Sequence, residues 1–370
     1  MEKYPCVYMR GGTSKAVVFH EKDLPHDRTE WSDLFLKVMG TPDAKQIDGM
    51  GGTVSSTSKI AVIAPSNQEG ADVNYTFFQV HIDKAVVSDS MNCGNISSVV
   101  GPFAIDEGLV KAVEPITTVR IFNTNSEKFM EERVRVKDGR ACVDGDVTIQ
   151  GVPGTGSPID MFFCDPCGAF TGKAFPTDLR KEFLDVPDFK TIEVTMFDCV
   201  NAVVFVKARD LGITGAEHVS LNGDSEFLDL IERIRMIAAM KMGFVEDWQG
   251  AVGTGVASPL LAFISEPQNY TDIEGNEVAA KEMDLCCRGV NLGKVHRAYP
   301  MSLAVATAAC SKLEGTIVHE MTRQRGADLV NLGHASGVSD CVVSLENGEV
   351  TKAGIIRTAR RIMDGYVYVR

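Results

Sequence analysis

The chain has 370 residues, of which 44% are hydrophobic and 24% are charged, a profile typical of a globular protein with two domains. Its net charge of −13 argues against a general nucleic-acid surface or an anionic membrane as partner. The sequence contains neither an apolar run of about 18 residues nor the pattern of a signal peptide, so we expect no membrane span and no export.

The ten cysteines have scattered spacings. Cys164-Asp165-Pro166-Cys167 is the one CxxC sequence, and neither a second CxxC nor paired histidines complete a zinc set. Most of these thiols fit the role of small core residues, so we expect reduced cysteines in a cytoplasmic protein. The sequence also lacks a phosphate-binding motif, a dinucleotide motif and a cluster of His, Asp and Glu, so we expect neither a cofactor nor a metal.

The first half is predicted to consist mostly of strands. Residues 5–19 indicate a strand, a Gly-rich turn and a second strand, and residues 29–39 carry apolar side chains at helical spacing. A loop rich in Gly, Ser and Thr then leads into a strand that opens with Lys59. A strand over 75–87 follows, and residues 96–105 indicate a helix that is apolar over most of its surface.

The turn over residues 89–96 joins that strand to that helix and contains Cys93, Gly94 and Asn95. Gly permits a tight turn, and Asn is a good N-cap residue. Free backbone N–H groups at the start of the helix would stabilise a thiolate or a bound carboxylate. A structural cysteine buried in front of a core helix fits this position equally well.

The second half repeats the order of the first. Strand, turn and strand recur over 191–206, an amphipathic helix over 225–242, and a Gly-rich loop with a strand over 253–264. Residues 303–310 are apolar nearly all round, as a helix buried on every side must be. The repetition predicts an internal duplication and an α+β fold of two similar domains, each a mostly antiparallel sheet wrapped around a central buried helix.

We expect the first half to span residues 1–187 and the second to span 188–353. The terminal strand, 354–370, is expected to return to the first half. The active site is then expected in the cleft between the two halves.

Reactive side chains are expected in the first half. Lys59 opens an apolar strand, where partial desolvation would favour the neutral amine of a base, although a solvated lysine is the simpler alternative. Ser14 lies in a Gly-rich turn whose N–H groups could hold a carboxylate, and Arg10 could bind one through two hydrogen bonds. His334 could donate to an anion, although an isolated histidine is more often structural. The second-half counterparts of Ser14, Lys59 and Cys93 differ in chemistry: Val200 or Asn201, Pro259, and Pro300 or Met301.

Several separate motifs occur in one order along the chain: Met9-Arg10-Gly11-Gly12-Thr13-Ser14-Lys15, Ile47-Asp48-Gly49-Met50-Gly51-Gly52, Thr57-Ser58-Lys59, Asn92-Cys93-Gly94-Asn95, Val100-Gly101-Pro102-Phe103-Ala104-Ile105, Gly333-His334-Ala335-Ser336-Gly337 and Arg357-Thr358-Ala359. Together they resemble the PrpF family, which contains methylaconitate cis–trans isomerase, methylitaconate Δ-isomerase and oxalomesaconate tautomerase. The resemblance implies the diaminopimelate-epimerase-like fold, in which each of two similar halves wraps a sheet around a central helix. This agrees with the duplication inferred from the repeated pattern.

The resemblance also implies roles for individual residues. It places the catalytic lysine at Lys59, the active-site cysteine at Cys93 and the serine of the Gly-rich turn at Ser14. Racemases of this fold use two cysteines, one from each half, and residues 300–302 lack the second one, which favours the isomerase branch. Substrate contacts are expected from Arg10, Thr13, Ser58, Gly94, Asn95, Asn125, Ser302, His334 and Ser336.

The expected activity is therefore a cofactor-independent allylic isomerisation of a small unsaturated di- or tricarboxylate, by a 1,3-proton shift or by cis–trans isomerisation. Two alternatives stay open: a racemase or epimerase acting α to a carboxylate, and a non-catalytic accessory protein that binds tricarboxylates. We expect a small anionic carboxylate as ligand, no nucleic-acid or membrane partner, and a homodimer or a higher homo-oligomer.

Overall fold

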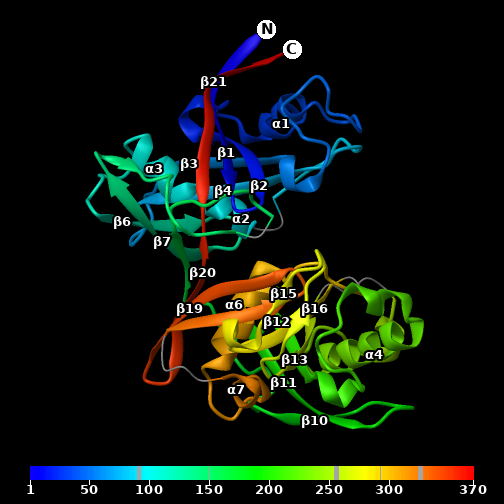
Figure 1. Cartoon of the computed structure of the whole chain (residues 1–370). Coiled ribbons are helices and arrows are strands. Elements are labelled where there is room, and N and C mark those ends of the chain that lie inside the picture. Colours follow the sequence, from blue (N-terminus) through cyan, green and yellow to red (C-terminus); the bar gives the residue numbers. More distant parts are fainter. Residues whose placement is uncertain (90–92, 150, 254–257, 292, 324–327) are drawn as a thin grey trace. The chain divides into compact units, whose positions relative to one another are not determined.

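The computed structural model describes residues 1–89, 93–149, 151–253, 258–291, 293–323 and 328–370 (Figure 1). The predicted turn over 89–96 and the predicted loop over 253–264 each lie partly outside these residues. By its contacts the chain divides into two compact units. Unit 1 comprises Met1–Cys164 and Ile356–Arg370, and unit 2 comprises Asp165–Ile355.

Unit 1 is built on a mixed sheet with a fixed order of strand pairing. Five successive pairs are antiparallel, parallel, antiparallel, parallel and antiparallel. The strands of this series are β1 (Glu2–Gly11), β2 (Ser14–His20), β3 (Lys59–Pro65), β4 (Val73–Val80), β6 (Ile116–Asn123) and β7 (Lys128–Lys137). At its ends the series continues antiparallel, with β21 (Ala359–Val369) on β1 and β9 (Ile159–Cys164) on β7. Two short strands pair antiparallel with members of the series: β5 (Val87–Ser88) with β4, and β8 (Arg140–Ala141) with β7.

The two faces of the unit 1 sheet are covered by different helices. Helix α1 (Trp31–Met39) packs its buried residues against Val17, Ile60 and other side chains of one face, which we call the outer face. On the opposite, inner face, His20 of β2 meets Phe103 of α3 (Val100–Asp106), with ring centroids 5.0 Å apart. The one-turn helix α2 (Gly94–Ser97) precedes α3 and contacts β1 and β2. Residues 96–105 are buried throughout, as expected of a central helix.

Unit 2 repeats the pairing order of unit 1. Its series is again antiparallel, parallel, antiparallel, parallel and antiparallel. The strands are β11 (Thr191–Cys199), β12 (Asn201–Lys207), β13 (Leu260–Ser265), β16 (Leu285–Asn291), β18 (Leu329–His334) and β19 (Gly337–Glu346). Further strands are β10 (Glu182–Asp185) on β11, β17 (Lys294–Val295) on β16, β20 (Glu349–Arg357) on β19, and the separate pair β14 (Tyr270–Thr271) and β15 (Glu277–Val278).

The helices of unit 2 take the places predicted by the repeat. Asp224 is the N-cap residue of helix α4 (Ser225–Lys241), and its carboxylate accepts a hydrogen bond from Phe227 N at 3.0 Å. The helix packs its apolar face on the sheet. Helix α6 (Met301–Ser311) is buried from Leu303 to Ser311 and contacts β11, β12, β18 and β19. The short helices α5 (Trp248–Ala251) and α7 (Ile317–Met321) complete the unit.

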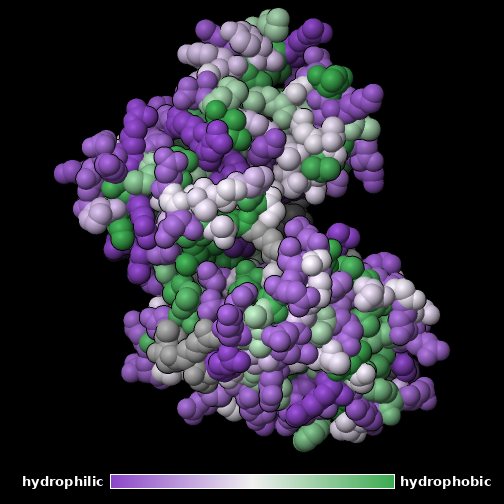
Figure 2. All heavy atoms as spheres, viewed as in Figure 1, coloured by the Kyte–Doolittle hydropathy of each residue, from purple (hydrophilic) through white to green (hydrophobic). Residues whose placement is uncertain are grey.

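The predicted α+β fold is confirmed, because each unit is a mostly antiparallel sheet around a buried helix. By contacts, the first segment of unit 1 ends at Cys164, before the sequence-based limit of the first half at residue 187. The reason lies in β10, which pairs with β11 and so joins the segment before residue 187 to unit 2. Hydrophilic side chains predominate over the face shown in Figure 2. Among the described residues, the longest apolar helices fall short of what a membrane span requires.

Candidate active site

Three polar side chains lie on the inner face of adjacent strands in unit 1. Side chains alternate between the faces of a strand, and Val17, Ile60 and Phe78 pack on the outer face against α1. The parallel register sets Val17 beside Ile60, and the antiparallel register sets Ile60 beside Phe78. It follows that the inner face carries Ser14 of β2, Lys59 of β3 and Gln79 of β4, on the side where α2 and α3 lie.

Lys59 is buried, with 7% of its surface exposed. Its Nζ donates a hydrogen bond to Gln79 Oε1 at 2.5 Å and lies 5.0 Å from the centroid of the Phe77 ring. Gln79 is itself held, because its Nε2 donates to the backbone oxygens of Ser58 at 2.9 Å and Ser55 at 3.2 Å. The amine is therefore fixed by a neutral amide and an aromatic ring.

The loop before Lys59 is fixed by a second buried amide. Ser58 is fully buried, and its hydroxyl accepts a hydrogen bond from Gln46 Nε2 at 2.8 Å. Gln46 Oε1 accepts another from Thr53 N at 2.9 Å. Ser58 therefore supports the loop through its hydroxyl, besides any contact it makes with a ligand.

The Gly-rich turn between β1 and β2 packs against the start of α2. Asn95 Nδ2 donates to Thr13 Oγ1 at 3.0 Å. Gly12 has φ +49°, and a Cβ there would overlap the Asn95 amide, so the close approach requires glycine. Arg10 Nη1 donates to the carbonyls of Gly12 at 3.0 Å and Thr358 at 2.9 Å, which ties the turn to the end of the chain. Burial and the nearby Arg360 lower the pKa of Arg10.

Cys93 is half-buried and is the N-cap residue of α2. Its carbonyl accepts hydrogen bonds from Ser97 N at 2.8 Å and Ser97 Oγ at 3.1 Å. The predicted neighbours Ser90 to Asn92 lie outside the described residues. The structure thus places Cys93, Gly94 and Asn95 at the beginning of the central helix.

Asn125, predicted to bind substrate, uses its side-chain amide for hydrogen bonds within the protein. Its Oδ1 accepts from Phe77 N at 2.8 Å, and its Nδ2 donates to Phe77 O at 2.9 Å and Asp89 O at 2.8 Å. Both amide protons are therefore used. The visible role of Asn125 is to fasten Asp89, at the start of the Cys93 turn, to β4.

Two fully buried acidic groups lie deeper on the inner face. Glu132 Oε2 accepts a hydrogen bond from Gly101 N of α3 at 2.7 Å, and burial raises the pKa of Glu132 to about 8. Burial also raises the pKa of the Tyr75 hydroxyl; the nearby Cys93 raises it further, and the Ser97 hydroxyl partly offsets the rise. Sequence reasoning did not single out either residue.

The predicted site residues of unit 2 also make internal hydrogen bonds. The Ser302 hydroxyl accepts from Asn201 Nδ2 at 3.5 Å. His334 Nδ1 accepts from Ser336 N at 3.2 Å, so Nε2 carries the proton that it shares with Ser339 Oγ at 2.8 Å. Ser336 Oγ donates to Arg297 O at 2.5 Å. These contacts give the three residues defined orientations within their own unit.

Sequence reasoning missed Gln79, the partner of Lys59. Its signal was a polar residue in line with Val73, Tyr75 and Phe77 on the inward side of β4. Only the register Lys59↔Gln79 turns that signal into a contact. Among the described residues, no group of three or more His, Cys, Asp or Glu side chains is arranged to hold a metal.

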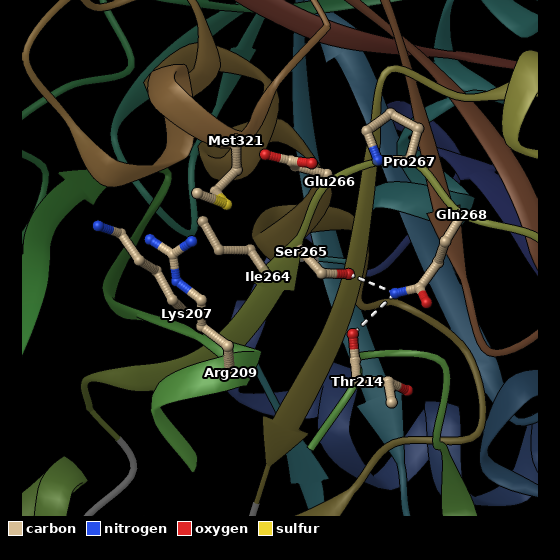
Figure 3. Close-up of a pocket in the computed structure, with 9 residues that line it drawn as sticks. All are labelled: Lys207, Arg209, Thr214, Ile264, Ser265, Glu266, Pro267, Gln268 and Met321. Carbon is tan, nitrogen blue, oxygen red and sulfur yellow. Dashed lines mark hydrogen bonds between the residues drawn. The ribbon is translucent and has the colours of Figure 1, made fainter. Parts of the chain in front are cut away.

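A cavity of about 310 Å³ lies in unit 2, and none of the predicted site residues lines it (Figure 3). It is lined by Lys207, Arg209, Thr214, Ile264, Ser265, Glu266, Pro267, Gln268 and Met321. The Lys207 ammonium is already paired with Glu193 at 2.6 Å, and Gln268 Nε2 donates to Ser265 Oγ and Thr214 O, both at 2.8 Å. The side chains of Lys207, Ser265 and Gln268 are therefore already engaged in hydrogen bonds or an ion pair.

Comparison with known proteins gives full-length matches. The model of the family described as PrpF protein matches residues 1–370. The 3-methylitaconate isomerase of Eubacterium barkeri is 43% identical, over 99% of this chain and 97% of that protein. The 2-methyl-aconitate isomerase of Shewanella oneidensis is 37% identical, over 99% and 97%. The (4E)-oxalomesaconate Delta-isomerase of a Novosphingobium species is 36% identical, over 100% and 98%.

Solved structures give a consistent result. The crystal structure of a methylitaconate-delta-isomerase matches with a TM-score of 0.96 and 43% identity, over 100% of this chain and 96% of that one. A hydroxyproline epimerase from Agrobacterium vitis matches with a TM-score of 0.50 and 12% identity, over 99% and 92%. The second likeness concerns the fold alone.

Proposed function

The chain belongs to the PrpF protein family, and from this we propose that it is a cofactor-independent isomerase of a small unsaturated di- or tricarboxylate. The observation that carries the proposal is the buried Lys59, held by Gln79 on the inner face of unit 1. The acceptor that holds the Lys59 amine is a neutral amide and not a carboxylate. A general base acts through its neutral amine.

The proposed reaction is an allylic proton transfer. The Lys59 amine removes a proton from the carbon allylic to the double bond, and the C–H electron pair delocalises into a dienolate. A proton then returns at the far end of the allyl system, so that the double bond moves, or rotates before the proton returns. Lys59 itself, the Cys93 thiol or the Ser14 hydroxyl supplies the returning proton.

Backbone N–H groups would stabilise the charge that develops on the substrate carboxylate. We propose those of Gly94 and Asn95 at the start of α2, and those of the Gly-rich turn around Thr13. The Asn95–Thr13 hydrogen bond supports this choice, because it holds the two segments together. Arg10 and Ser58 are proposed to assist from the same unit, and Asn125 to act by fastening Asp89.

Substrate contacts are also proposed for residues of unit 2. Ser302, His334 and Ser336 are proposed as carboxylate contacts. His334 and Ser336 lie in one of the motifs that resemble the family, and Ser302 lies in the first turn of α6. We retain the halves 1–187 and 188–353 as the proposed repeat units. A cytoplasmic location and a homo-oligomer are also proposed; the former is supported by the scattered spacing of the ten cysteines.

The candidate substrates follow from the relatives: 3-methylitaconate, 2-methylaconitate and 4-oxalomesaconate. The test incubates the protein with each acid in deuterated water and follows the proton NMR spectrum. We expect a shifted or isomerised double bond with at least one of them, and deuterium at an allylic carbon. Exchange α to a carboxylate with inversion and no double-bond shift would identify a racemase or epimerase. Binding without exchange of any acid would identify a non-catalytic protein.

A further inference from the structure

Cys167 and Cys199 face each other across an antiparallel bridge in unit 2. The flanking hydrogen bonds run from Gly168 N to Asp198 O at 2.9 Å and from Val200 N to Pro166 O at 2.8 Å. This pattern makes Cys167 and Cys199 a non-hydrogen-bonded pair, the arrangement in which opposite Cα atoms approach to about 4.5 Å and side chains lie closest. That separation falls within the range of about 4.4–6.8 Å that a disulfide accepts.

The two thiols lie on facing residues of the bridge and differ in access. The Cys167 thiol lies within hydrogen-bonding reach of the Cys199 thiol. Cys167 is partly exposed, whereas Cys199 is fully buried. A dissolved oxidant therefore reaches Cys167 first and finds the second thiol directly behind it.

The segment that carries Cys167 is held in place on β11. Asp198 Oδ2 accepts hydrogen bonds from Phe170 N at 2.8 Å, Thr171 N at 2.6 Å and Thr171 Oγ1 at 2.9 Å. With the two bonds flanking the bridge, five hydrogen bonds fasten this segment around the cysteine pair. Forming a bond between the sulfurs then requires little loss of chain entropy, because the backbone is already ordered.

We propose that Cys167 and Cys199 form a reversible disulfide on exposure to a hydroperoxide. The Cys167 sulfur attacks the peroxide O–O bond, giving a sulfenic acid and one water molecule. The Cys199 sulfur then attacks the Cys167 sulfur and releases the second water, so that two thiols and one hydrogen peroxide become one disulfide and two waters. A dithiol reductant reverses the change.

The buried position of Cys199 affects the rate of the second step. Burial raises the pKa of the Cys199 thiol, and the hydrogen bond with Cys167 raises it further. Because the thiolate is the attacking form, closure of the disulfide accelerates as pH rises.

The disulfide would fasten the segment around Cys167 to the hairpin turn that joins β11 to β12. Val200 turns that hairpin with φ +58°, and the next residue, Asn201, donates to Ser302 Oγ at the start of α6. The dithiol therefore lies next to the part of unit 2 that corresponds to the Gly-rich turn of unit 1. The proposal stands on this geometry and is independent of the proposed isomerase activity.

The test oxidises the full-length protein with hydrogen peroxide and maps its peptides by mass spectrometry without reduction. We expect loss of two hydrogens, a Cys167–Cys199 cross-link that exceeds any other pair by at least about tenfold, and reversal by dithiothreitol. Cys167→Ser should abolish the cross-link while the fold is kept, because its side chain is partly exposed. Cys142→Ser, which replaces a half-buried thiol of unit 1, should leave the cross-link unchanged.

Two outcomes would overturn the proposal. One is oxidation of Cys167 to sulfinic acid while Cys199 stays reduced. The other is a cross-link that survives in the Cys167→Ser protein, since it would then join other cysteines. Because Cys199→Ser could disturb the buried strand, the exposed member of the pair is the one to substitute.

Discussion

At the scale of single residues, the environment of Lys59 depends on the chemistry of Gln79. The amide oxygen of Gln79 accepts from the Lys59 amine, and the amide nitrogen is anchored on backbone oxygens. A neutral acceptor positions the amine without a full negative charge that would favour the ammonium form. Gln79 therefore acts as a positioning residue for the proposed base.

Gln79→Glu tests this role. A carboxylate beside Lys59 would favour the ammonium form, so kcat at pH 7 should fall about tenfold or more and the acid limb of the pH–rate profile should move to higher pH. Isomerase rates measured from pH 6 to 10 check this. Gln68→Glu, at an exposed loop position, is the matched control. A lower rate with an unmoved profile would mean that Gln79 has only a structural role.

Glu132 is a second residue whose protonation matters, and here the effect is on stability. Its pKa is about 8 in the folded protein and close to 4.5 when exposed. Between these pH values the folded state keeps a proton that the unfolded state releases. The contribution of Glu132 to stability is therefore fully present at low pH and is lost as pH rises towards 8.

Glu132→Gln should remove this pH dependence. The free energy of unfolding of the variant relative to the parent should rise between pH 5 and pH 8, by on the order of 2–4 kcal/mol. Urea denaturation at the two pH values measures the change. Glu69→Gln, at an exposed position, should give no such difference. An equal effect of Glu132→Gln at both pH values would show that Glu132 is ionised in the folded protein.

At the scale of elements, the central helices explain why the two units share one architecture. Helix α6 is lined with small side chains, and Ala304, Ala306, Ala308 and Ala309 are almost completely buried. Small residues let the strands approach the helix from all sides, and the close packing leaves no room for added bulk.

Ala306→Leu should therefore destabilise the protein. Overpacking of a close-packed core costs about 1–3 kcal/mol. Thermal and urea unfolding measure the effect, with Ser32→Leu on the exposed side of α1 as a control that adds similar bulk. Equal stability of Ala306→Leu and the parent would show that α6 has unfilled space around it.

At the scale of the whole molecule, unit 1 needs both ends of the chain. β21 pairs with β1 from Glu2↔Val369 to Gly11↔Ala359, with one irregularity beside Tyr8. Val367 and Val369 also join the buried cluster under α1. The last strand is therefore part of the core of the unit in which the chain begins.

Removing residues 359–370 should destabilise unit 1 selectively. Limited proteolysis followed by mass spectrometry should find the first new cuts within residues 1–164, because β1 loses its partner strand. Tyr366→Ser with Tyr368→Ser keeps the ladder, removes two exposed rings and should leave the cuts unchanged. First cuts within unit 2 would contradict this view of the fold.

The repeat and the central helices could be predicted from the sequence, because hydrophobic periodicity is visible within short stretches of the chain. Lys59 and Ser14 stood out for the same reason, since each lies beside a Gly-rich or Ser-rich turn. The contact of Lys59 with Gln79, the engaged amide of Asn125 and the Cys167–Cys199 bridge depend on strand register. Register joins residues far apart in the chain, so no local pattern reports it.

Lys59→Ala is the most direct test of the proposed base. In deuterated water, with the acid that the parent protein isomerises, the variant should lose turnover and deuterium incorporation by about 10²–10⁴-fold while it unfolds at the parent temperature. Lys15→Ala is the control, because the Lys15 side chain leaves β2 on the outer face, over the Tyr8 ring. Turnover and deuterium incorporation by Lys59→Ala at the rate of the Lys15→Ala control would contradict the assignment of Lys59 as the base.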